Sequence, residues 1–470
     1  MEERKGFGST FGFLMAAVGS AVGLGNIWGF PNKMGANGGF TFLIIYLILA
    51  ALCGFVVMVG ELALGRKTGR GVVSAYQVLS KRFKWLGWLG IIAPFLILSF
   101  YCALGGYCVK YVVLNVGNIF GAGFGNNGLA SGEVFGNMLT NQLESVIYGL
   151  IFVLLTLIIV MGGVSSGIEK FCSIGMPCLF FMLVIVIIRA CTLPGAVDGL
   201  KYMFVPGWAV EHGVIEKAPS VIKVLSNAGG QMFFSLSLGM GIMITYGSYT
   251  GKEVNLVRST AMICIFDTLV ALIAGLAIFP SVAHFDPALL GSSKGVALMF
   301  IILPQVFESM GGVGQVVSFA FFVMVDIAAI TSVVSLIEVV TQFVIQKFHA
   351  HRKRAALIVA GVCFLVSIPI GISLGHVAIL EESSPALFGL DWLTFFDEVT
   401  NTVLMPVCAL FSCIVVGWFI TPKRAVAEIE AGGTPMAGWL KKVYAVMIRF
   451  VTPALILIVE IGGLQSEIAA

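Results

Sequence analysis

The sequence predicts an all-α protein that crosses a membrane eleven times. Of its 470 residues, 59% are hydrophobic and only 11% are charged, which is about half the charged fraction of a soluble domain. Apolar runs that reach the roughly 20 residues needed to cross a bilayer as a helix recur along the whole chain. We assign eleven spans, at about residues 11–37, 41–65, 87–119, 145–163, 169–191, 224–250, 257–281, 311–346, 355–375, 392–420 and 444–464.

Lys and Arg residues indicate the orientation of these spans. They gather at the N-terminus and near alternate connections, at 66–84, 252–258, 347–354 and 423–449. Because cytoplasmic loops carry the excess of basic residues, we expect the N-terminus in the cytoplasm and, after eleven crossings, the C-terminus outside. The basic clusters are explained as determinants of topology, and no nucleic-acid partner is expected.

The first span is interrupted by glycine and proline. It contains the segment Gly19-Ser-Ala-Val-Gly-Leu-Gly-Asn-Ile-Trp-Gly-Phe-Pro31, in which an unbroken helix is unfavourable. A helix broken at membrane depth is tolerated only where its backbone is covered by protein or lines a cavity. Freed carbonyl groups bind cations, and freed helix N-termini bind anions. The segment therefore predicts a polar site inside the membrane.

The second and third spans each carry one residue of interest. Glu61 lies near the inner end of the second span. It is either an interfacial residue beside Arg66 or a carboxylate that accepts hydrogen bonds from an unwound backbone. Tyr101 in the third span, like Phe234 in the sixth, is either a core residue or a cover over a bound side chain.

The sixth span is interrupted like the first. It reads Gly229-Gly-Gln-Met-Phe-Phe-Ser-Leu-Ser-Leu-Gly-Met-Gly-Ile242. Because the two spans lie five apart, repeats of five helices at about 8–191 and 224–421 would have opposite topologies. Paired interrupted helices at matching positions indicate the central site of a transporter, whereas the alternative is that the glycines only permit close helix packing. The chain forms one membrane domain, with an extra helix at about 444–464.

The seventh and eighth spans carry acids and hydroxyl groups. An acid costs about 2.5–3.5 kcal/mol at the centre of a span, so Asp267 among its apolar neighbours favours a site. In the eighth span, Ala328, Thr331 and Ser332 offer oxygen atoms of the kind that hard cations bind, although Ser and Thr also bond back to their own helix. Asp326 lies about 140° around the helix from Thr331, and an ion pair or a packing role explains it as well as transport does.

Other classes of function find little support. The sequence has no nucleotide-binding loop, zinc-ligand spacing or nucleophile–base arrangement, and its ten cysteines include no CxxC pair. We therefore expect neither an enzyme nor a disulfide framework. A gated channel is an alternative that the broken helices around a compact neutral pocket disfavour.

These residues resemble the neurotransmitter:sodium symporter family, above all its bacterial amino-acid transporters. The resemblance rests on Gly19 to Asn26 with Trp28 and Phe30-Pro31, on Phe233 to Gly241 with Ile244-Thr-Tyr246, and on Thr331-Ser332. It implies the LeuT-type fold, a 5+5 inverted repeat in which helices 1 and 6 are unwound. It also implies sodium-coupled symport of an amino acid by alternating access in the bacterial inner membrane.

The resemblance implies two sodium sites and one substrate site. Carried over by position, the first sodium site comprises Ala21, Asn26, Ser235 and Asp267. The second comprises Gly19, Val22, Ala328, Thr331 and Ser332. The substrate would be surrounded by Ser20, Ala21, Gly25, Ile97, Tyr101, Phe234, Ser235, Ser237, Met240, Ser332 and Leu336. This apolar lining, with the flexible Met240, suits a hydrophobic or aromatic L-amino acid.

The chain departs from the family at the residues that close the transport path. The family has Arg at the position of Gly29, so the acid at Asp397 lacks its usual partner on the outer side. On the inner side, the usual Asp is replaced by Gln346, so Arg4 needs Glu338 or another group.

The resemblance assigns supporting roles to four further residues. Tyr249 and Glu61 would support the gates, and the spacing of Gly167 and Pro177 matches one that permits inner unwinding of the fifth span in relatives. As a spacing alone, this last pattern has little specificity.

Asp267 also implies transport that does not depend on chloride. Chloride-dependent relatives have a neutral residue at this position and bind chloride among residues that correspond to Tyr46, Gln231 and Ser235. A carboxylate at 267 would itself supply the negative charge. Sodium is therefore the only cofactor expected. A proton-coupled amino-acid transporter of the same architecture is the nearest alternative, and the sequence indicates no oligomeric state.

Overall fold

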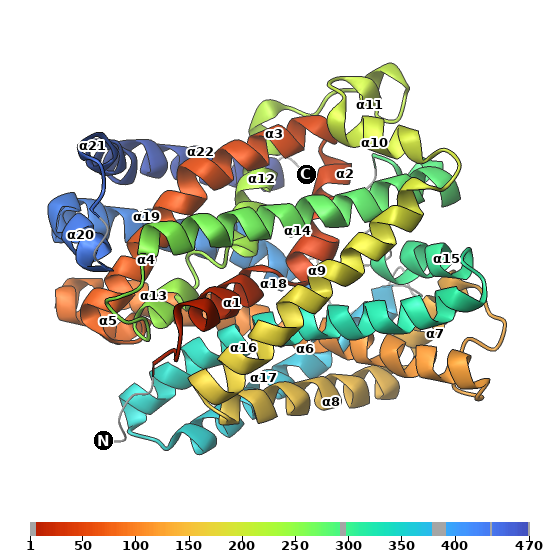
Figure 1. The fold of residues 1–470 in the computed structure, drawn as a ribbon, viewed down its shortest axis with the longest axis horizontal. Helices are drawn as coiled ribbons and strands as arrows, with labels where there is room; N and C mark the ends of the chain where they lie inside the picture. The colour runs from red at the N-terminus through yellow and green to blue at the C-terminus, as the bar shows by residue number, and fades with distance from the viewer. Residues whose placement is uncertain (1–5, 292–297, 378–391, 433–434, 469–470) are drawn as a thin grey trace.

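A computed structural model describes residues 6–291, 298–377, 392–432 and 435–468, and the regular structure within these ranges is helical throughout. Among these residues, nine helices are long and apolar enough to cross a membrane, and one bent pair adds a tenth. Most of the long helices run lengthwise through the molecule (Figure 1). The protein is therefore all-α and crosses the membrane several times, as the sequence predicts.

The unbroken spans begin and end within several residues of the predicted limits. They are α3 (Phe40–Leu49) continued by α4 (Phe55–Thr68), α6 (Lys84–Phe120), α8 (Gln142–Met161), α9 (Lys170–Cys191), α14 (Leu256–Phe285), α16 (Gly312–Phe348), α17 (Arg352–Val377), α18 (Trp392–Glu398) continued by α19 (Met405–Ile414), and α21 (Gly438–Val446) continued by α22 (Thr452–Ile468).

The first span is broken over a shorter segment than its glycines suggest. Helix α1 (Thr10–Ala21) ends before Val22, and helical structure resumes at Leu24 and continues into α2 (Phe30–Ala36) with a bend of 45°. The backbone N–H of Gly23 donates a hydrogen bond of 3.1 Å to Oδ1 of Asn26. A side chain thus replaces a backbone partner that the break removes.

The sixth span is broken over residues 236–241, between α12 (Val221–Ser235) and α13 (Ile242–Gly247). Gly239 and Gly241 have φ values of 71° and 70°, a left-handed conformation that glycine adopts without strain. Because the break leaves two short helices, this segment is not among the nine continuous spans. The total of eleven crossings stays a prediction.

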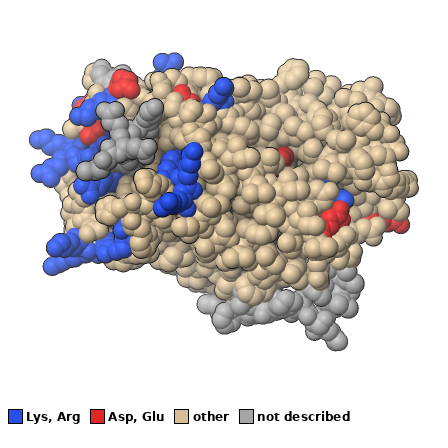
Figure 2. Space-filling model, turned by 90° about the horizontal axis from the view of Figure 1, so that it is seen from below, with Lys and Arg blue, Asp and Glu red and all other residues tan. Residues whose placement is uncertain are grey.

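Shorter helices lie at both ends of the molecule (Figure 1). They are α5 (Val72–Leu79) and α20 (Pro422–Ile429) at the end near the N-terminus, and α7 (Ser131–Thr140), α10 (Ala196–Phe204), α11 (Trp208–Glu211) and α15 (Leu303–Glu308) at the opposite end. Figure 2 shows that most Lys and Arg side chains visible on this face gather at the first of these ends. The charge asymmetry seen in the sequence is thus also one of the folded molecule.

Candidate functional site

A small cavity lies between the two broken spans. It measures about 20 Å³, which is room for about one water molecule. Its lining includes every residue that the resemblance assigns to the substrate. The lining residues are Ser20, Ala21, Gly25, Ile97, Tyr101, Phe234, Ser235, Ser237, Met240, Ile242, Ser332, Ser335 and Leu336. Larger occupants therefore require side chains to move.

Two aromatic side chains line this cavity. The ring centroids of Tyr101 and Phe234 lie 6.2 Å apart. A Cβ atom on Gly25 would lie only 2.6 Å from the Phe234 ring, and one on Gly23 would lie 3.2 Å from the Tyr101 hydroxyl oxygen. The glycines of the first span therefore let both rings approach its backbone.

Asn26, Ser235 and Asp267 form one buried cluster. Nδ2 of Asn26 donates to Oδ1 of Asp267 at 2.7 Å and to Oγ of Ser235 at 3.0 Å. Oγ of Ser235 lies 2.8 Å from Oδ1 of Asp267, and the Tyr46 hydroxyl group donates to Oδ2 at 3.1 Å. Asp267 is completely buried. Three of the four residues expected at the first sodium site, Asn26, Ser235 and Asp267, are therefore in direct contact.

The residues expected at the second sodium site also lie together. Oγ of Ser332 lies 3.4 Å from the carbonyl oxygens of Gly19 and Ser20 and 3.5 Å from that of Val22. Oγ1 of Thr331 donates to the carbonyl oxygen of Ala328 at 2.9 Å. Carbonyl and hydroxyl oxygens that converge in this way are ligands that hard cations prefer.

The cavity contains two residues that sequence reasoning missed, the polar Ser335 and the apolar Ile242. Oγ of Ser20 donates to Oγ of Ser335 at 2.8 Å and lies 3.2 Å from Oγ of Ser237. Ser335 lies one helical turn after Ser332 on the same face of α16, and that spacing was a signal for it. Ile242, the first residue of α13, also lines the cavity. It was missed because its position depends on the path that the chain takes through the break in the sixth span.

Glu61 is buried beside the break in the sixth span. It is 1% exposed. Its Oε1 accepts hydrogen bonds from the backbone N–H of Gly239 at 3.2 Å and from Oγ of Ser412 at 3.3 Å. Arg66, the alternative neighbour, instead forms an ion pair with Glu428 of α20. The structure thus places Glu61 as an acceptor for the unwound backbone.

Glu338 pairs with Arg352, a cation that the sequence analysis did not consider. Arg352 contacts both of its carboxylate oxygens, at 3.0 Å and 2.5 Å, and Tyr249 donates to Oε1 at 2.6 Å. Arg4 lies outside the described residues. The pair forms because Arg352 begins α17 directly after the turn that follows α16, which carries Glu338.

Further contacts close the same end of the molecule. Glu169 accepts hydrogen bonds from the backbone N–H of Gly8 at 2.7 Å and from Oγ of Ser9 at 2.8 Å. The backbone N–H of Phe7 donates to the carbonyl oxygen of Tyr249 at 3.3 Å. The segment before α1 is therefore fastened to both the fifth and the sixth spans.

At the opposite end of the molecule, Asp397 is hydrogen-bonded to Asn401 of its own span. Its Oδ1 accepts a hydrogen bond of 2.5 Å from Nδ2 of Asn401. A Cβ atom on Gly29 would lie 3.3 Å from Oε1 of Gln231. Lys33 lies one helical turn after Gly29 and is near enough to Asp397 for the two groups to attract when both are ionised.

Three other candidate residues do not join the cavity. Oδ1 of Asp326 is buried, with no hydrogen-bond partner among the described residues, so the structure shows no ion pair for it there. Gly167 lies in the helical turn that precedes α9, and Pro177 lies inside α9. The fifth span is helical at both positions, and its unwinding stays a prediction.

Comparisons with known proteins agree with this architecture. A model described as the sodium:neurotransmitter symporter family matches residues 4–120 and 130–467. An uncharacterised sodium-dependent transporter of Bacillus subtilis is 34% identical over 453 residues, which cover 96% of each chain. A second uncharacterised sodium-dependent transporter, from Methanocaldococcus jannaschii, is 28% identical over 99% of this chain and 93% of its own.

A solved structure shows the same fold. The crystal structure of MhsT in complex with L-phenylalanine matches with a TM-score of 0.88 at 34% identity, and the match covers 98% of this chain and 100% of that chain. MhsT has the LeuT-type fold, so the fold class predicted from the sequence is confirmed.

Proposed function

The chain belongs to the sodium:neurotransmitter symporter family, and we propose that it carries hydrophobic or aromatic L-amino acids into the cell together with sodium. Members of this family are sodium-dependent transporters and not enzymes. One observation carries the proposal on substrate. All eleven positions that the resemblance assigns to the amino acid line one cavity between the two broken spans.

The chemistry of the cavity supports a substrate with an uncharged side chain. None of its thirteen lining residues carries a charged side chain. Ile97, Met240, Ile242 and Leu336 supply apolar surface, and helix ends at the breaks supply partial charges for an amino group and a carboxylate. MhsT, at 34% identity, holds L-phenylalanine in its crystal structure, which also favours an aromatic amino acid.

The two oxygen clusters support the use of two sodium ions. The cluster at Asp267 offers a carboxylate and a hydroxyl group, and the cluster at Ser332 offers carbonyl oxygens of the first span. Each cluster joins a broken span to an unbroken one. Bound sodium would therefore hold the broken spans against α14 and α16, which explains why substrate binding would need sodium.

Transport would not require chloride. Tyr46 and Ser235, two of the three positions that would hold chloride in relatives, instead contact the Asp267 carboxylate. Gln231, the third, donates to the carbonyl oxygen of Gly25 at 2.8 Å. The negative charge needed beside sodium would thus belong to the protein.

Alternating access would move the broken spans within repeats at about 8–191 and 224–421. The contacts of Glu169 and Tyr249 with the segment before α1 would break when the site opens to the cytoplasm. The basic end of the molecule would face the cytoplasm of a bacterial inner membrane, because basic residues mark the inner side. The C-terminus would then lie outside.

Binding of labelled L-phenylalanine to the purified protein tests the proposal. Binding should occur in sodium chloride and be lost in potassium chloride at the same pH, and competition with all twenty amino acids should rank Phe, Tyr, Trp, Leu and Ile above polar residues. Binding in potassium that responds to pH would favour the proton-coupled alternative. Failure of every amino acid to bind would reject the substrate class.

A further inference from the structure

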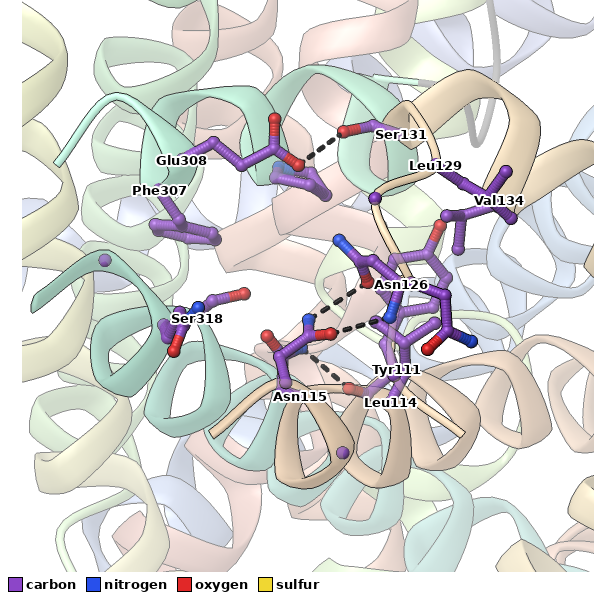
Figure 3. A pocket seen from close by; sticks show the side chains of 18 of the residues that line it. Tyr111, Leu114, Asn115, Asn126, Leu129, Ser131, Val134, Phe307, Glu308 and Ser318 are labelled. Atoms are coloured by element: carbon purple, nitrogen blue, oxygen red, sulfur yellow. Dashed lines mark hydrogen bonds between the residues drawn. The ribbon is translucent and has the colours of Figure 1, made fainter. Parts of the chain in front are cut away.

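A second, larger cavity lies at the end of the molecule opposite the N-terminus. It measures about 690 Å³, within the range of small-molecule sites. It lies between the end of α6, residues 121–130, the start of α7, α15 and the start of α16 (Figure 3). None of its lining residues lines the central cavity, so the two are separate sites.

We call this second cavity the outer cavity, because its end of the molecule would face outward in the proposed orientation. Hydrogen bonds and close packing hold one of its walls in place. Oδ1 of Asn118 accepts the backbone N–H of Asn126 at 2.6 Å, and Nδ2 of Asn118 donates to Oδ1 of Asn126 at 3.0 Å. A Cβ atom on Gly117 would lie 2.5 Å from the backbone nitrogen of Gly125. The segment 121–130 therefore packs directly on the end of α6, and these contacts hold the wall in place.

The other wall is formed by α15 and α16. Figure 3 shows Phe307, Glu308 and Ser318 across the cavity from Leu129 and Val134. Oγ of Ser131 donates to Oε1 of Glu308 at 3.2 Å, which joins the two walls. Arg189 donates to Ser309 at 3.0 Å and 3.2 Å, but Arg189 does not line the cavity.

The lining combines one negative charge with uncharged polar and apolar surface. Among the described residues that line the cavity, Glu308 is the only one with a charged side chain, and none is Lys, Arg or His. Asn115 is 3% exposed and uses Nδ2 on the carbonyl oxygen of Tyr111 at 2.7 Å. Phe307 and Val134 are also buried and supply apolar surface.

We propose that this outer cavity binds a small organic ammonium compound with an apolar body. The ammonium group would lie at Glu308, because an unneutralised carboxylate attracts a cation and repels an anion. The apolar body would pack on Phe307 and Val134. A single carboxylate is too small a ligand set for a divalent metal ion.

An occupant would also affect the transporter. It would bridge α6, α15 and α16, and both α6 and α16 carry residues that line the central cavity. We therefore expect it to slow uptake without competing with the transported substrate. This effect rests on the proposed function, whereas binding to the outer cavity does not.

Calorimetric titration of the purified protein in potassium chloride, without sodium, tests the site. The probe is 2-phenylethylammonium, and 2-phenylethanol is its uncharged counterpart. The amine should bind saturably, and the alcohol should bind at least about fivefold more weakly, as should the amine to Glu308→Gln. Equal binding of amine and alcohol, or no binding of the amine, would overturn the proposal.

Three variants locate the binding. Gln315→Arg places a positive charge on the exposed lining of the outer cavity and should abolish amine binding. Glu211→Gln removes an exposed acid of α11 that lies outside the cavity, and Ser332→Ala changes the central cavity. Neither of these two variants should alter binding of the amine. Unchanged binding to Glu308→Gln or Gln315→Arg, or loss with Ser332→Ala, would contradict the site. A chain that binds the amine but no amino acid would reject the proposed transport function alone.

Discussion

The Asp267 carboxylate and the Asn26 amide are in direct contact, with Nδ2 of Asn26 2.7 Å from Oδ1 of Asp267. Asn26 lies just after the break in the first span, and Asp267 lies in the middle of α14. The same carboxylate also receives the hydroxyl groups of Ser235 and Tyr46. Ser235 is the last residue of α12 in the sixth span. The Asp267 carboxylate, carried by the unbroken helix α14, is therefore hydrogen-bonded to both broken spans.

Replacement of Asp267 by Asn should change the response to chloride. The amide keeps the size of the side chain but removes its negative charge. Uptake by the natural chain should be equal in sodium chloride and sodium gluconate, whereas Asp267→Asn should need chloride or lose transport. Asp326→Asn, on a half-buried acid outside the cavity, is the control and should stay insensitive to chloride. Unaltered chloride-independent uptake by Asp267→Asn would sink the proposed role.

Loss of the Thr331 hydroxyl group should weaken sodium binding. Thr331→Val keeps the shape of the side chain and removes one proposed ligand. The sodium concentration for half-maximal binding of phenylalanine should rise about tenfold, which corresponds to about 1.4 kcal/mol for a lost polar contact. Thr341→Val, on a buried threonine in the same helix, is the matched control. If both variants need the same sodium concentration as the natural chain, Thr331 is not a ligand.

The ion pair between Glu338 and Arg352 should be required for stability. Arg352→Gln leaves a carboxylate that is completely buried without its cation, which costs about 3–5 kcal/mol. The midpoint of thermal unfolding in detergent should fall clearly. The double variant Glu338→Gln with Arg352→Gln removes both charges and should recover much of the loss. A double variant as unstable as Arg352→Gln alone would show that the charges are not coupled.

Lys33 should take part in closing the outer side of the path. It lies one turn after Gly29 in the first span and is near enough to Asp397 for the two groups to attract when both are ionised. Lys33→Gln and Asp397→Asn should each lower the rate of uptake. The double variant should be no slower than either single variant, because both changes remove the same interaction. Lys217→Gln, on an exposed loop residue, is the control. Additive losses in the double variant would show that the two residues act separately.

The sequence predicts the breaks and the buried acids better than it predicts their partners. Glycine and proline disfavour helix through local backbone effects, so the breaks at residues 22–23 and 236–241 can be predicted from the sequence alone. Which residue meets a buried acid depends on how distant helices pack. The contacts of Glu61 with Gly239 and of Glu338 with Arg352 therefore emerge only in the folded molecule.

The outer cavity shows the same limit more strongly. Its lining comes from loop residues 121–130 and from helix ends that carry no motif. Glu308, the single acid among the described lining residues, is an ordinary residue in the sequence, and its position between the two walls depends on how distant segments pack. The central cavity was easier to predict because its residues follow a specific family pattern around Gly19 and Phe234.

Uptake of labelled L-phenylalanine into liposomes that contain the purified protein tests the central claim most directly. With sodium outside and potassium inside, the natural chain should accumulate phenylalanine above its external concentration, and Asp267→Ala should not. With potassium on both sides, accumulation should vanish even when a proton gradient is imposed. Accumulation driven by the proton gradient without sodium, or no accumulation of any amino acid in sodium, would contradict sodium-coupled amino-acid transport.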